Sequence, residues 1–543
     1  MPRLLIQQNT MRTLDKRRAW LAILVFNAVL WAQTSILDQV ENGAERNAFA
    51  ALYEERDALK RRSLAANFLH SYPSSWLLAP IHEAAAKAAA DMGDLPSAVF
   101  HARESLRLYP ENPGLLVPFA AWQARRDEKR AAESSASEAL RYLNLFVSPS
   151  GKVRDELRAV ALSIAPEPLS TPGVVAGKYA GSAICGQCHR AEYAAWKSTG
   201  MANMLRPLEK ARVIGDFAKR AFGDFRVGTA DRPFIELRRR NGEWDRYPVA
   251  FTIGSKWQQA YAVRDRGGDL HVLPVQYNRL IGEWVNYWKM IDPPGSERAE
   301  LASFHRMERV TSYGENCAPC HTSQLRAQGF AEAGVNCEMC HGPMADHARG
   351  GQARIQFKKL SPVESVRVCA QCHAQSAQRE SSAFPPAYRR RPYAEFAPRA
   401  FYRDGRFKET TFLVEAFERS SCYRRGGATC VSCHAPHTDG AGEKGLRFPA
   451  DPDRMCSQCH AADQFAVAKH TKHQAGSEGA RCAACHMPKI MNSLLFQAGS
   501  HQIDEKPSAA MTARFGQKDS PNACLLCHRE KGVPWVSEQL RSW

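Results

Sequence analysis

A five-residue pattern, Cys-x-x-Cys-His, occurs eight times in this 543-residue chain, and every Cys-x-x-Cys is followed by His. The eight patterns use 16 of the 17 cysteines. Their cysteines are Cys185, Cys188, Cys317, Cys320, Cys337, Cys340, Cys369, Cys372, Cys430, Cys433, Cys456, Cys459, Cys482, Cys485, Cys524 and Cys527. The histidines that follow are His189, His321, His341, His373, His434, His460, His486 and His528. Eight repeats of one reactive pattern constrain the fold more than any other feature of the sequence.

The chemistry that requires this pattern is the covalent attachment of haem c. Two thiols add to the vinyl groups of the porphyrin, and the next residue places its imidazole on the iron as the proximal ligand. Zinc sites and disulfides also use Cys-x-x-Cys, but neither requires His directly after the second Cys every time. We therefore predict eight covalently attached haem c groups, with zinc or disulfide pairs as the alternative.

The first 33 residues have the pattern of a signal peptide. The apolar run Ala19–Ala32 follows Arg12, Lys16, Arg17 and Arg18, is short for a membrane span and is followed by polar residues. Haem c is attached outside the cytoplasm, so we expect a periplasmic or otherwise exported protein. The alternative is an uncleaved N-terminal anchor, which would be the protein's one expected contact with a membrane.

The formal charge of +17 does not indicate a nucleic-acid partner. Eight haems bring propionates worth roughly −16, and the excess of Lys and Arg balances them through charge-assisted pairs. Glu338 and Arg349, beside the third motif, are expected to be structural partners of propionates. No basic stripe interleaved with aromatic residues, of the kind that binds nucleic acid, occurs in the sequence.

Composition divides the chain near residue 166, before which there is no Cys. The predicted fold is mostly α with extensive irregular structure. Pairs of Tyr-Pro at residues 72–73 and 109–110, with Ala102 and Ala136 at a similar interval, resemble the tetratricopeptide repeat, a stacked helix pair. Such a domain would dock a protein, and a plain helical bundle is the alternative. The expected boundaries are 1–33 for the signal peptide, 44–165 for the repeat-like domain, 166–178 for a linker and 179–543 for the cytochrome domain.

The cytochrome domain offers about 45 residues for each haem, too few to build a separate apolar core around each one. The haems themselves must therefore form the core and lie close enough to exchange electrons. Residues 190–316 contain a stretch without a motif, in which Val, Ile, Tyr and Trp alternate with polar residues. This pattern predicts a small β insert of two or more hairpins, which either caps a haem or binds a partner.

A haem that only passes electrons needs a second axial ligand. Beyond the motif histidines, the cytochrome domain holds seven others, which we predict as distal ligands: His271, His305, His347, His437, His470, His473 and His501. Seven distal histidines leave eight haems one ligand short.

Several stretches around the motifs resemble the cytochrome c-554/c-552 type of multihaem cytochrome. They include YAGSAICGQCHRAEYAAWKSTGMANM (179–204), GVNCEMCHGPMADH (334–347), GGATCVSCHAPH (426–437), ARCAACHMPK (480–489) and SPNACLLCHREKGVPW (520–535). The resemblance covers residues 179–540. It implies a secreted protein with covalently bound haem c that transfers electrons between protein partners, and fusion to tetratricopeptide repeats is common in that family.

One position departs from the family. Its members usually carry a distal His five residues after the Trp that follows the first motif, whereas here Trp196 is followed at that offset by Met201. We predict that Met201 is the eighth distal ligand and gives one haem a higher potential than its bis-His neighbours. Met204 is a competing ligand, and a packing role for Met201 is the alternative.

The predicted function is an electron relay along eight haems between protein redox partners, and we assign no catalytic residue. The alternative is an oxidoreductase of small nitrogen or sulfur compounds, such as nitrite, hydroxylamine or tetrathionate, at one haem with an open site. A third possibility is a scaffold or sensor in which the repeats are the active part. The spare thiol, Cys422, is expected to be structural.

Overall fold

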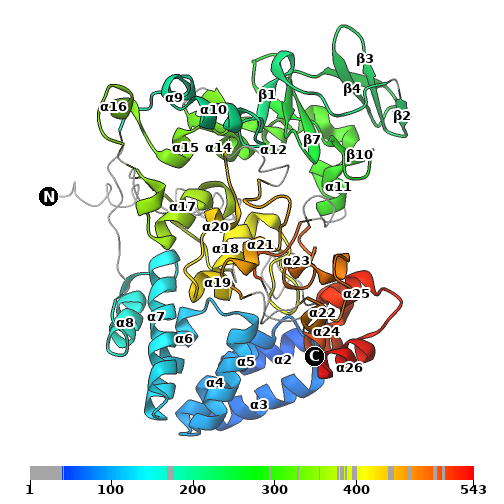
Figure 1. Ribbon diagram of the computed structural model, residues 1–543. Coiled ribbons are helices and arrows are strands. Elements are labelled where there is room, and N and C mark those ends of the chain that lie inside the picture. The colour runs from blue at the N-terminus through cyan, green and yellow to red at the C-terminus, as the bar shows by residue number, and fades with distance from the viewer. Residues whose placement is uncertain are drawn as a thin grey trace, which may run out of the picture. The chain divides into compact units, whose positions relative to one another are not determined.

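The computed structural model describes residues 40–543 except positions 41, 168–176, 219, 293–294, 327–328, 354, 376–377, 380–383, 386–387, 394–399, 438–444, 462–466, 493–497 and 504–507. The segment expected to be a signal peptide, residues 1–33, and most of the expected linker therefore lie outside the described residues. Within the described part, no helix has both the length and the apolar composition that a bilayer span requires. The chain forms two compact units (Figure 1).

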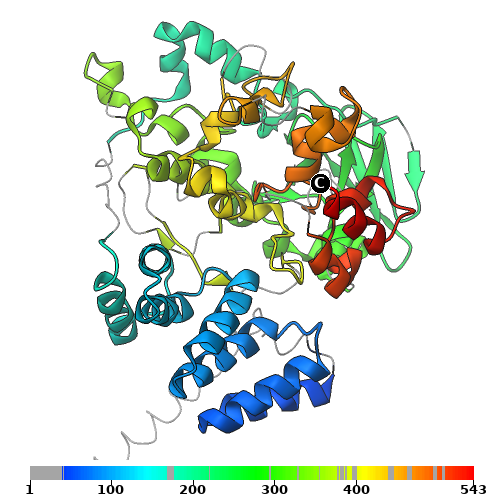
Figure 2. The ribbon, with the colours of Figure 1, turned by 60° about the horizontal axis from the view of Figure 1, so that its bottom comes forward.

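The first unit is a stack of antiparallel helices with two short segments from the C-terminal half of the chain, residues 390–406 and 511–520. Small residues allow the helices to approach closely, since Ala98 and Ala102 are fully buried against Ala86 and Ala89. Figure 2 shows the helices side by side. They are α2 (Gly43–Glu54), α3 (Ala58–Ser71), α4 (Leu78–Asp91), α5 (Leu95–Leu108), α6 (Pro113–Arg125), α7 (Lys129–Leu145) and α8 (Gly151–Leu162).

Polar caps fix where these helices begin. The side chains of Asp57, Asp94 and Asn112 accept hydrogen bonds from backbone N–H groups in the first turns of α3, α5 and α6. A proline in the first turn of α5 and α6 has its backbone angle preset for the helix. The expected N-terminal helices are present, and their resemblance to the tetratricopeptide repeat stays a prediction.

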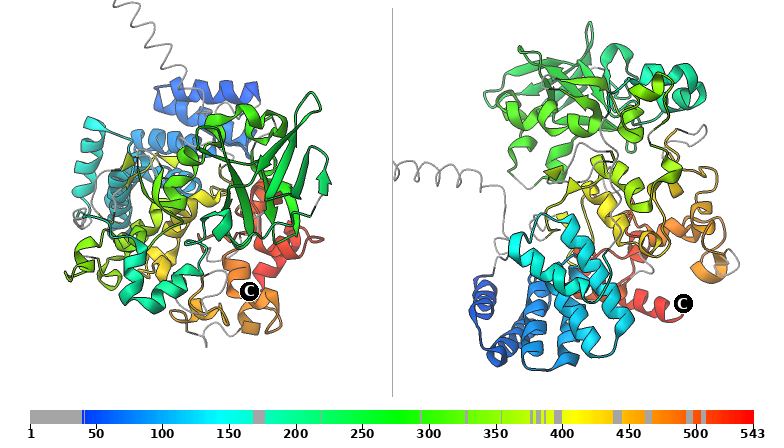
Figure 3. Two further views of the ribbon diagram at one scale, coloured as in Figure 1. Left: turned by 90° about the horizontal axis from the view of Figure 1, so that it is seen from above. Right: turned by 90° about the vertical axis from the view of Figure 1, so that its left-hand side faces the viewer.

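The second unit contains residues 170–389, 407–510 and 521–543. It is built largely from short helices joined by irregular chain, as the thin ribbons of Figure 3 show. The helices that carry or flank the motifs are α9 (Ser182–Cys188), α10 (Arg190–Lys197), α13 (Tyr313–Asn316), α14 (Ala318–His321), α15 (Glu338–His341), α16 (Ala345–Ala348), α17 (Pro362–His373), α18 (Leu413–Arg419), α19 (Ser421–Arg424), α20 (Cys430–Cys433), α21 (Arg454–Ser457), α22 (Val467–Thr471), α23 (Cys482–His486), α25 (Ala523–Cys527) and α26 (Val533–Arg541).

The expected β-rich insert is also present, as two antiparallel sheets. The four-stranded sheet has the order β2-β3-β4-β5, and the six-stranded sheet has the order β1-β6-β7-β9-β10 with β8 paired to β7. The strands are β1 (Leu205–Pro207), β2 (Arg220–Phe222), β3 (Phe225–Thr229), β4 (Pro233–Arg238), β5 (Trp244–Pro248), β6 (Phe251–Ile253), β7 (Gln258–Arg264), β8 (Leu270–Val272), β9 (Val275–Asn278) and β10 (Glu283–Asn286).

The insert has an apolar core of its own, which includes the fully buried side chains of Ile235, Tyr261 and Val275. A second cluster joins β1, β6, β7 and β8 to the segment around the second motif, through Tyr313 and Ala318. The insert is therefore an integral part of this unit. Two small hairpins complete the sheets: β11 (Thr322–Leu325) with β12 (Phe330–Ala333), and β13 (Gln378–Arg379) with β14 (Tyr388–Arg389).

Candidate haem-binding site

Each motif folds as about one helical turn. The backbone N–H of the motif His donates to the carbonyl of the first Cys, for example from His189 to Cys185 at 2.8 Å and from His341 to Cys337 at 3.0 Å. Residues three and four apart lie on one face of a helix, so both thiols and the imidazole face the same side. This is the arrangement that attachment of one haem by two thioethers and one axial ligand requires.

The motifs line one large cavity in the second unit. Its volume is about 4850 Å³, and all 16 motif cysteines contribute to its wall. A pocket for a single small molecule has about 300–1,000 Å³, so this space is several times too large for one ligand of that size. Most of the lining side chains are apolar or sulfur-bearing. A cavity of this size and composition fits a set of bulky, largely apolar cofactors.

Five motif histidines face a second His across this unit. The ring centroids are 6.1 to 6.4 Å apart in the pairs His189–His347, His341–His437, His434–His501, His486–His470 and His528–His473. An imidazole nitrogen lies about 2 Å from a transition metal that it binds, so two rings on opposite sides of one iron have centroids about 6 Å apart. The spacing of all five pairs therefore fits a bis-imidazole haem.

Backbone carbonyls orient three of the facing histidines. His347 Nδ1 bonds to the Gly351 carbonyl at 3.0 Å, His501 Nδ1 to Gly499 at 3.1 Å, and His473 Nδ1 to Thr471 at 2.5 Å. A carbonyl only accepts, so each Nδ1 carries the proton and each Nε2 keeps its lone pair for a metal.

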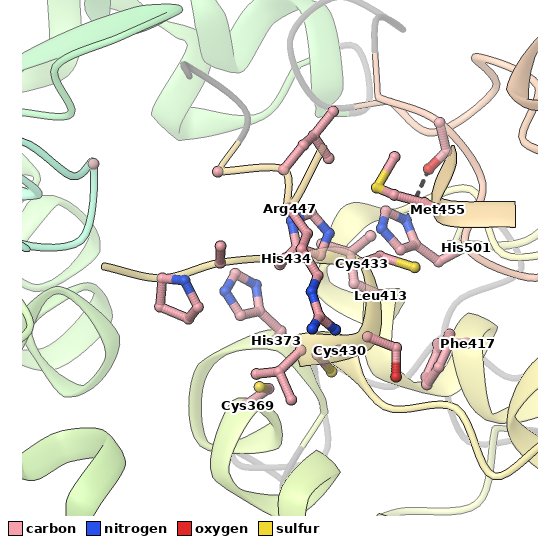
Figure 4. A pocket seen from close by; sticks show the side chains of 18 of the residues that line it. Cys369, His373, Leu413, Phe417, Cys430, Cys433, His434, Arg447, Met455 and His501 are labelled. Carbon is pink, nitrogen blue, oxygen red and sulfur yellow. Dashed lines mark hydrogen bonds between the residues drawn. The ribbon is translucent and has the colours of Figure 1, made fainter. Parts of the chain in front are cut away.

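Burial also keeps His501 in the neutral form that binds a metal. It lowers the pKa of His501 to about 4, with a smaller contribution from neighbouring His434. Figure 4 shows His434 and His501 beside Cys430 and Cys433 in this part of the cavity.

The structure does not bring every predicted ligand to a motif. His271 Nδ1 lies 3.1 Å from Thr311 Oγ1 and its Nε2 lies 3.3 Å from Asp265, so both ring nitrogens are engaged inside the insert. His305 is exposed. Neither His271 nor His305 lines the cavity, whereas Met201 and Met204 both do.

Three motif histidines differ from the five paired ones. Among the described residues, His321 is in none of the His pairs, and its ring lies 6.3 Å from that of Tyr313 between centroids. His373 and His460 line the cavity as well, and neither forms one of the five His pairs. Figure 4 shows His373 near Arg447, a basic side chain on the cavity wall.

Contacts between thiols give the order of the motifs in space. Four close pairs join first Cys to first Cys or second Cys to second Cys: Cys185–Cys337, Cys320–Cys372, Cys369–Cys430 and Cys456–Cys482. Three further pairs of thiols lie near enough for one to act electrostatically on the other. They are Cys340–Cys372, Cys433–Cys459 and Cys485–Cys524. If the motifs are numbered 1 to 8 along the chain, these thiol contacts connect them in the order 1–3–4–5–6–7–8. Among the described thiols, motif 2 joins this line through motif 4 alone.

Glu338 has a different role from the one expected. Its carboxylate, on a side chain only 1% exposed, accepts hydrogen bonds from the backbone N–H groups of Ala180, Gly181 and Met344. The Glu338 oxygens that accept these hydrogen bonds are not available to a haem propionate. A carboxylate also repels a propionate, because both are negatively charged. Glu338 therefore ties motif 3 to the chain before motif 1. Arg349 pairs with Asp346 at 2.6 Å on the surface.

The spare thiol, Cys422, lines the cavity and lies near enough to Cys433 and Cys459 for electrostatic interaction with both. Burial raises its pKa above the ordinary value, so the thiol form is favoured.

Comparison with known proteins places the motifs in a family context. Residues 283–342 match the family described as "Cytochrome c554 and c-prime", and residues 424–465 match the doubled CXXCH motif. The dissimilatory sulfite reductase MccA of Wolinella succinogenes is 23% identical over 402 residues, which cover 59% of this chain and 52% of that protein. The multiheme cytochrome MtrA of Shewanella baltica is 24% identical over 211 residues, 38% of this chain and 46% of that protein.

The chain therefore spans about half the length of these two curated relatives. Among solved structures, the outer cell wall cytochrome OcwA aligns with a TM-score of 0.45 at 18% identity, covering 68% of this chain and 87% of that one. The octaheme sulfite reductase MccA of Wolinella succinogenes aligns with a TM-score of 0.32 at 18% identity, covering 63% and 61%. With its motifs, its facing histidines and these sequence relatives, the chain belongs to the multihaem c-type cytochromes and carries haem c covalently.

Proposed function

We propose that this cytochrome binds eight haems and relays electrons along them between protein redox partners. The five His pairs at 6.1 to 6.4 Å are the observation that carries this function, because a haem with two imidazole ligands has no free position for a substrate. We assign His347, His437, His501, His470 and His473 as the distal ligands of the haems at motifs 1, 3, 5, 7 and 8. Met201 stays the predicted ligand of one further haem.

The proposed path follows the thiol contacts, 1–3–4–5–6–7–8, with the haem of motif 2 as a side branch at motif 4. A hydrogen bond supports the central step, since Gln371 Nε2 of motif 4 donates to the carbonyl of Met339 in motif 3 at 2.9 Å. Thiols in contact hold the edges of their haems close together, which electron transfer needs.

The remaining parts of the proposal concern location and partners. Export through the N-terminal segment fits the attachment of haem c outside the cytoplasm. The helical repeats, as a unit of the tetratricopeptide type, are proposed to dock a protein partner.

Mass spectrometry and electron paramagnetic resonance of the ferric holoprotein test this function. We expect a mass increase of eight haems and at least five low-spin irons with bis-imidazole signals. A smaller haem number, or fewer than five such irons, would contradict the proposal. Removing the motif thiols one pair at a time assigns each signal to its haem.

A second candidate function is the reduction of a small nitrogen or sulfur compound at the haem of motif 2. The supporting observation is that none of the five His pairs among the described residues includes His321, which leaves the position opposite this proximal ligand for a substrate. If this function is correct, nitrite, hydroxylamine, tetrathionate or sulfite reoxidises the dithionite-reduced holoprotein over repeated turnovers.

A further inference from the structure

Three helices of the first unit end in the same way. Helices α3, α5 and α7 end at intervals of 37 residues, and the residue after each end is aromatic: Tyr72, Tyr109 and Phe146. Because consecutive helices in the stack are antiparallel, every second helix ends on the same side. We call these three helix ends the aromatic edge, and it consists of residues 72–76, 108–109 and 145–147.

Residues 390–393 bind the aromatic edge at the end of α7. The Arg390 N–H donates to the Leu145 carbonyl, and the Arg390 carbonyl accepts from the Val147 N–H, both at 2.9 Å. The ring of Tyr393 meets the ring of Phe146 edge to face, with centroids 5.3 Å apart, and both side chains are buried. This helix end therefore holds the segment through both its main chain and an aromatic side chain.

Residues 400–406 bind the other two helix ends. Gly405 has φ of 84° and lies so close to α5 that a Cβ would overlap the Leu108 carbonyl, so only glycine fits there. The Arg403 guanidinium donates to the Ser74 carbonyl, and its centre lies 5.0 Å from the ring centroid of Trp76. The described parts of the 390–406 segment thus contact all three ends of the aromatic edge.

A second segment, residues 511–520, is held at the same place. The carboxylate of Asp404, on a side chain only 5% exposed, accepts a hydrogen bond from Ser520 Oγ at 2.6 Å and pairs with Arg406 at 2.7 Å. Phe515 packs in the apolar cluster at the start of α4. Three residues after Ser520 the chain reaches Cys524, the first thiol of motif 8.

We propose that the aromatic edge is a binding site for the chain's own residues 390–393, 400–406 and 511–520, and that this binding positions motif 8. The four peptide links from Ser520 to Cys524 span at most about 14 Å, so a displacement of Ser520 is passed to the haem attached at Cys524. The inference goes beyond the proposed function, which gives the helices of this unit a partner protein. It assigns one edge of the unit to the chain itself.

The test compares Gly405→Ala with Gly93→Ala in the full-length holoprotein. Both glycines have a positive φ, 84° and 79°, so both variants carry similar backbone strain, but a Cβ at Gly93 has nothing within 4 Å. Hydrogen exchange of residues 511–519 should be at least about tenfold faster in Gly405→Ala and within about twofold of the wild type in Gly93→Ala.

The second readout is the haem of motif 8. Its resonance signal is the one that disappears in the double variant Cys524→Ala, Cys527→Ala. We expect this signal to shift in Gly405→Ala and to stay unchanged in Gly93→Ala, with the haem number of the wild type in both by mass spectrometry.

The two readouts separate the two parts of the proposal. Unchanged exchange in Gly405→Ala would show that the aromatic edge does not hold residues 511–520. Faster exchange with an unchanged motif 8 signal would show that the edge binds its segments without positioning the haem. If Gly405→Ala does not fold, Asp404→Asn replaces it, because this variant keeps the side-chain shape and removes the charge that pairs with Arg406. It should produce the same two changes at smaller size.

Discussion

At the scale of single residues, the facing histidines depend on neighbours that make room for them. The ring of His473 faces His528 with centroids 6.1 Å apart, and Gly479 lies directly against that ring. A Cβ at position 479 would overlap the imidazole of His473. The histidines themselves were visible in the sequence. The requirement for Gly479 was not, because it depends on the folded position of a ring six residues away.

We expect Gly479→Ala to displace His473 and remove the second imidazole from the haem of motif 8. One low-spin signal should then be replaced by a high-spin signal, and the potential of that haem should rise. Gly43→Ala is the control, because a Cβ there has nothing within 4 Å and the residue lies at the start of α2. A resonance spectrum of Gly479→Ala identical to that of the wild type would refute the pairing of His473 with His528.

The buried carboxylate of Glu338 gives a second prediction. Glu338→Gln replaces an acceptor of three backbone N–H groups by an amide whose NH₂ opposes some of them. We expect a loss of about 2–4 kcal/mol in the free energy of unfolding, because charge-assisted bonds are replaced and buried donors lose their acceptor. Denaturant titration measures the loss. The exposed substitution Glu530→Gln should change the free energy by less than about 0.5 kcal/mol.

At the scale of elements, helices α4 and α5 hold a histidine pair that involves no haem motif. His82 Nδ1 and His101 Nδ1 are 3.0 Å apart, and His82 is 6% exposed. Burial, with smaller contributions from the nearby charges of His101, Arg514 and Arg107, lowers the pKa of His82 from 6.5 to about 4. The neutral state of His82 therefore allows the two rings to share a hydrogen bond between α4 and α5.

This pair predicts acid sensitivity of the first unit. Below pH 6.5 the unfolded chain binds a proton at His82 that the folded unit does not bind, so stability falls as the pH drops towards about 4. The expected loss is about 3 kcal/mol. Hydrogen exchange of α4 and α5 at pH 7 and pH 4.5 measures it. His82→Gln should remove most of this pH dependence, and an unchanged dependence in that variant would show that other groups cause it.

The elements themselves were partly predictable. Alternating apolar residues indicated the strands of the insert, and the repeated Ala positions indicated closely packed helices, since both patterns are local. The sequence did not indicate that residues 511–520 belong to the first unit, where Met511 and Phe515 pack on Leu78. Contacts between residues more than 400 positions apart leave no periodic signal.

At the scale of the whole molecule, the proposed line of haems has one side branch. Removing the haem of motif 2 with Cys317→Ala and Cys320→Ala should leave electron transit unchanged. Removing the haem of motif 4 with Cys369→Ala and Cys372→Ala should slow it by at least about tenfold, because motif 4 is the link between motifs 3 and 5.

Flash photoreduction measures this transit. A ruthenium label on Glu192→Cys, an exposed position on α10 beside motif 1, injects electrons at one end of the line. Mass spectrometry should find seven haems in each double variant, which shows that the other sites are intact. Equal slowing in the two variants would contradict the branched order.

The haem attachment sites could be predicted from sequence because their chemistry is confined to five consecutive residues. The sequence predicted seven distal histidines but not their partners. Five of the seven face a motif His in the fold, whereas His271 contacts Thr311, His305 is exposed, and the role of both as ligands stays a prediction. Their environments depend on the insert, whose sheets turn His271 towards Asp265. Such long-range geometry cannot be predicted from the spacing of residues along the chain.

In a simple chain of carriers, the number of stored electrons rises only with the length of the route. A side branch separates this storage capacity from the length of the route. On the proposed order, an electron crosses seven haems from motif 1 to motif 8, whereas the eight proposed haems together would hold eight electrons. The haem of motif 2 would then be a reservoir, since it adds capacity without lengthening the route. A protein of this design can keep an electron in reserve when its acceptor is absent and still transmit at the rate of the main line.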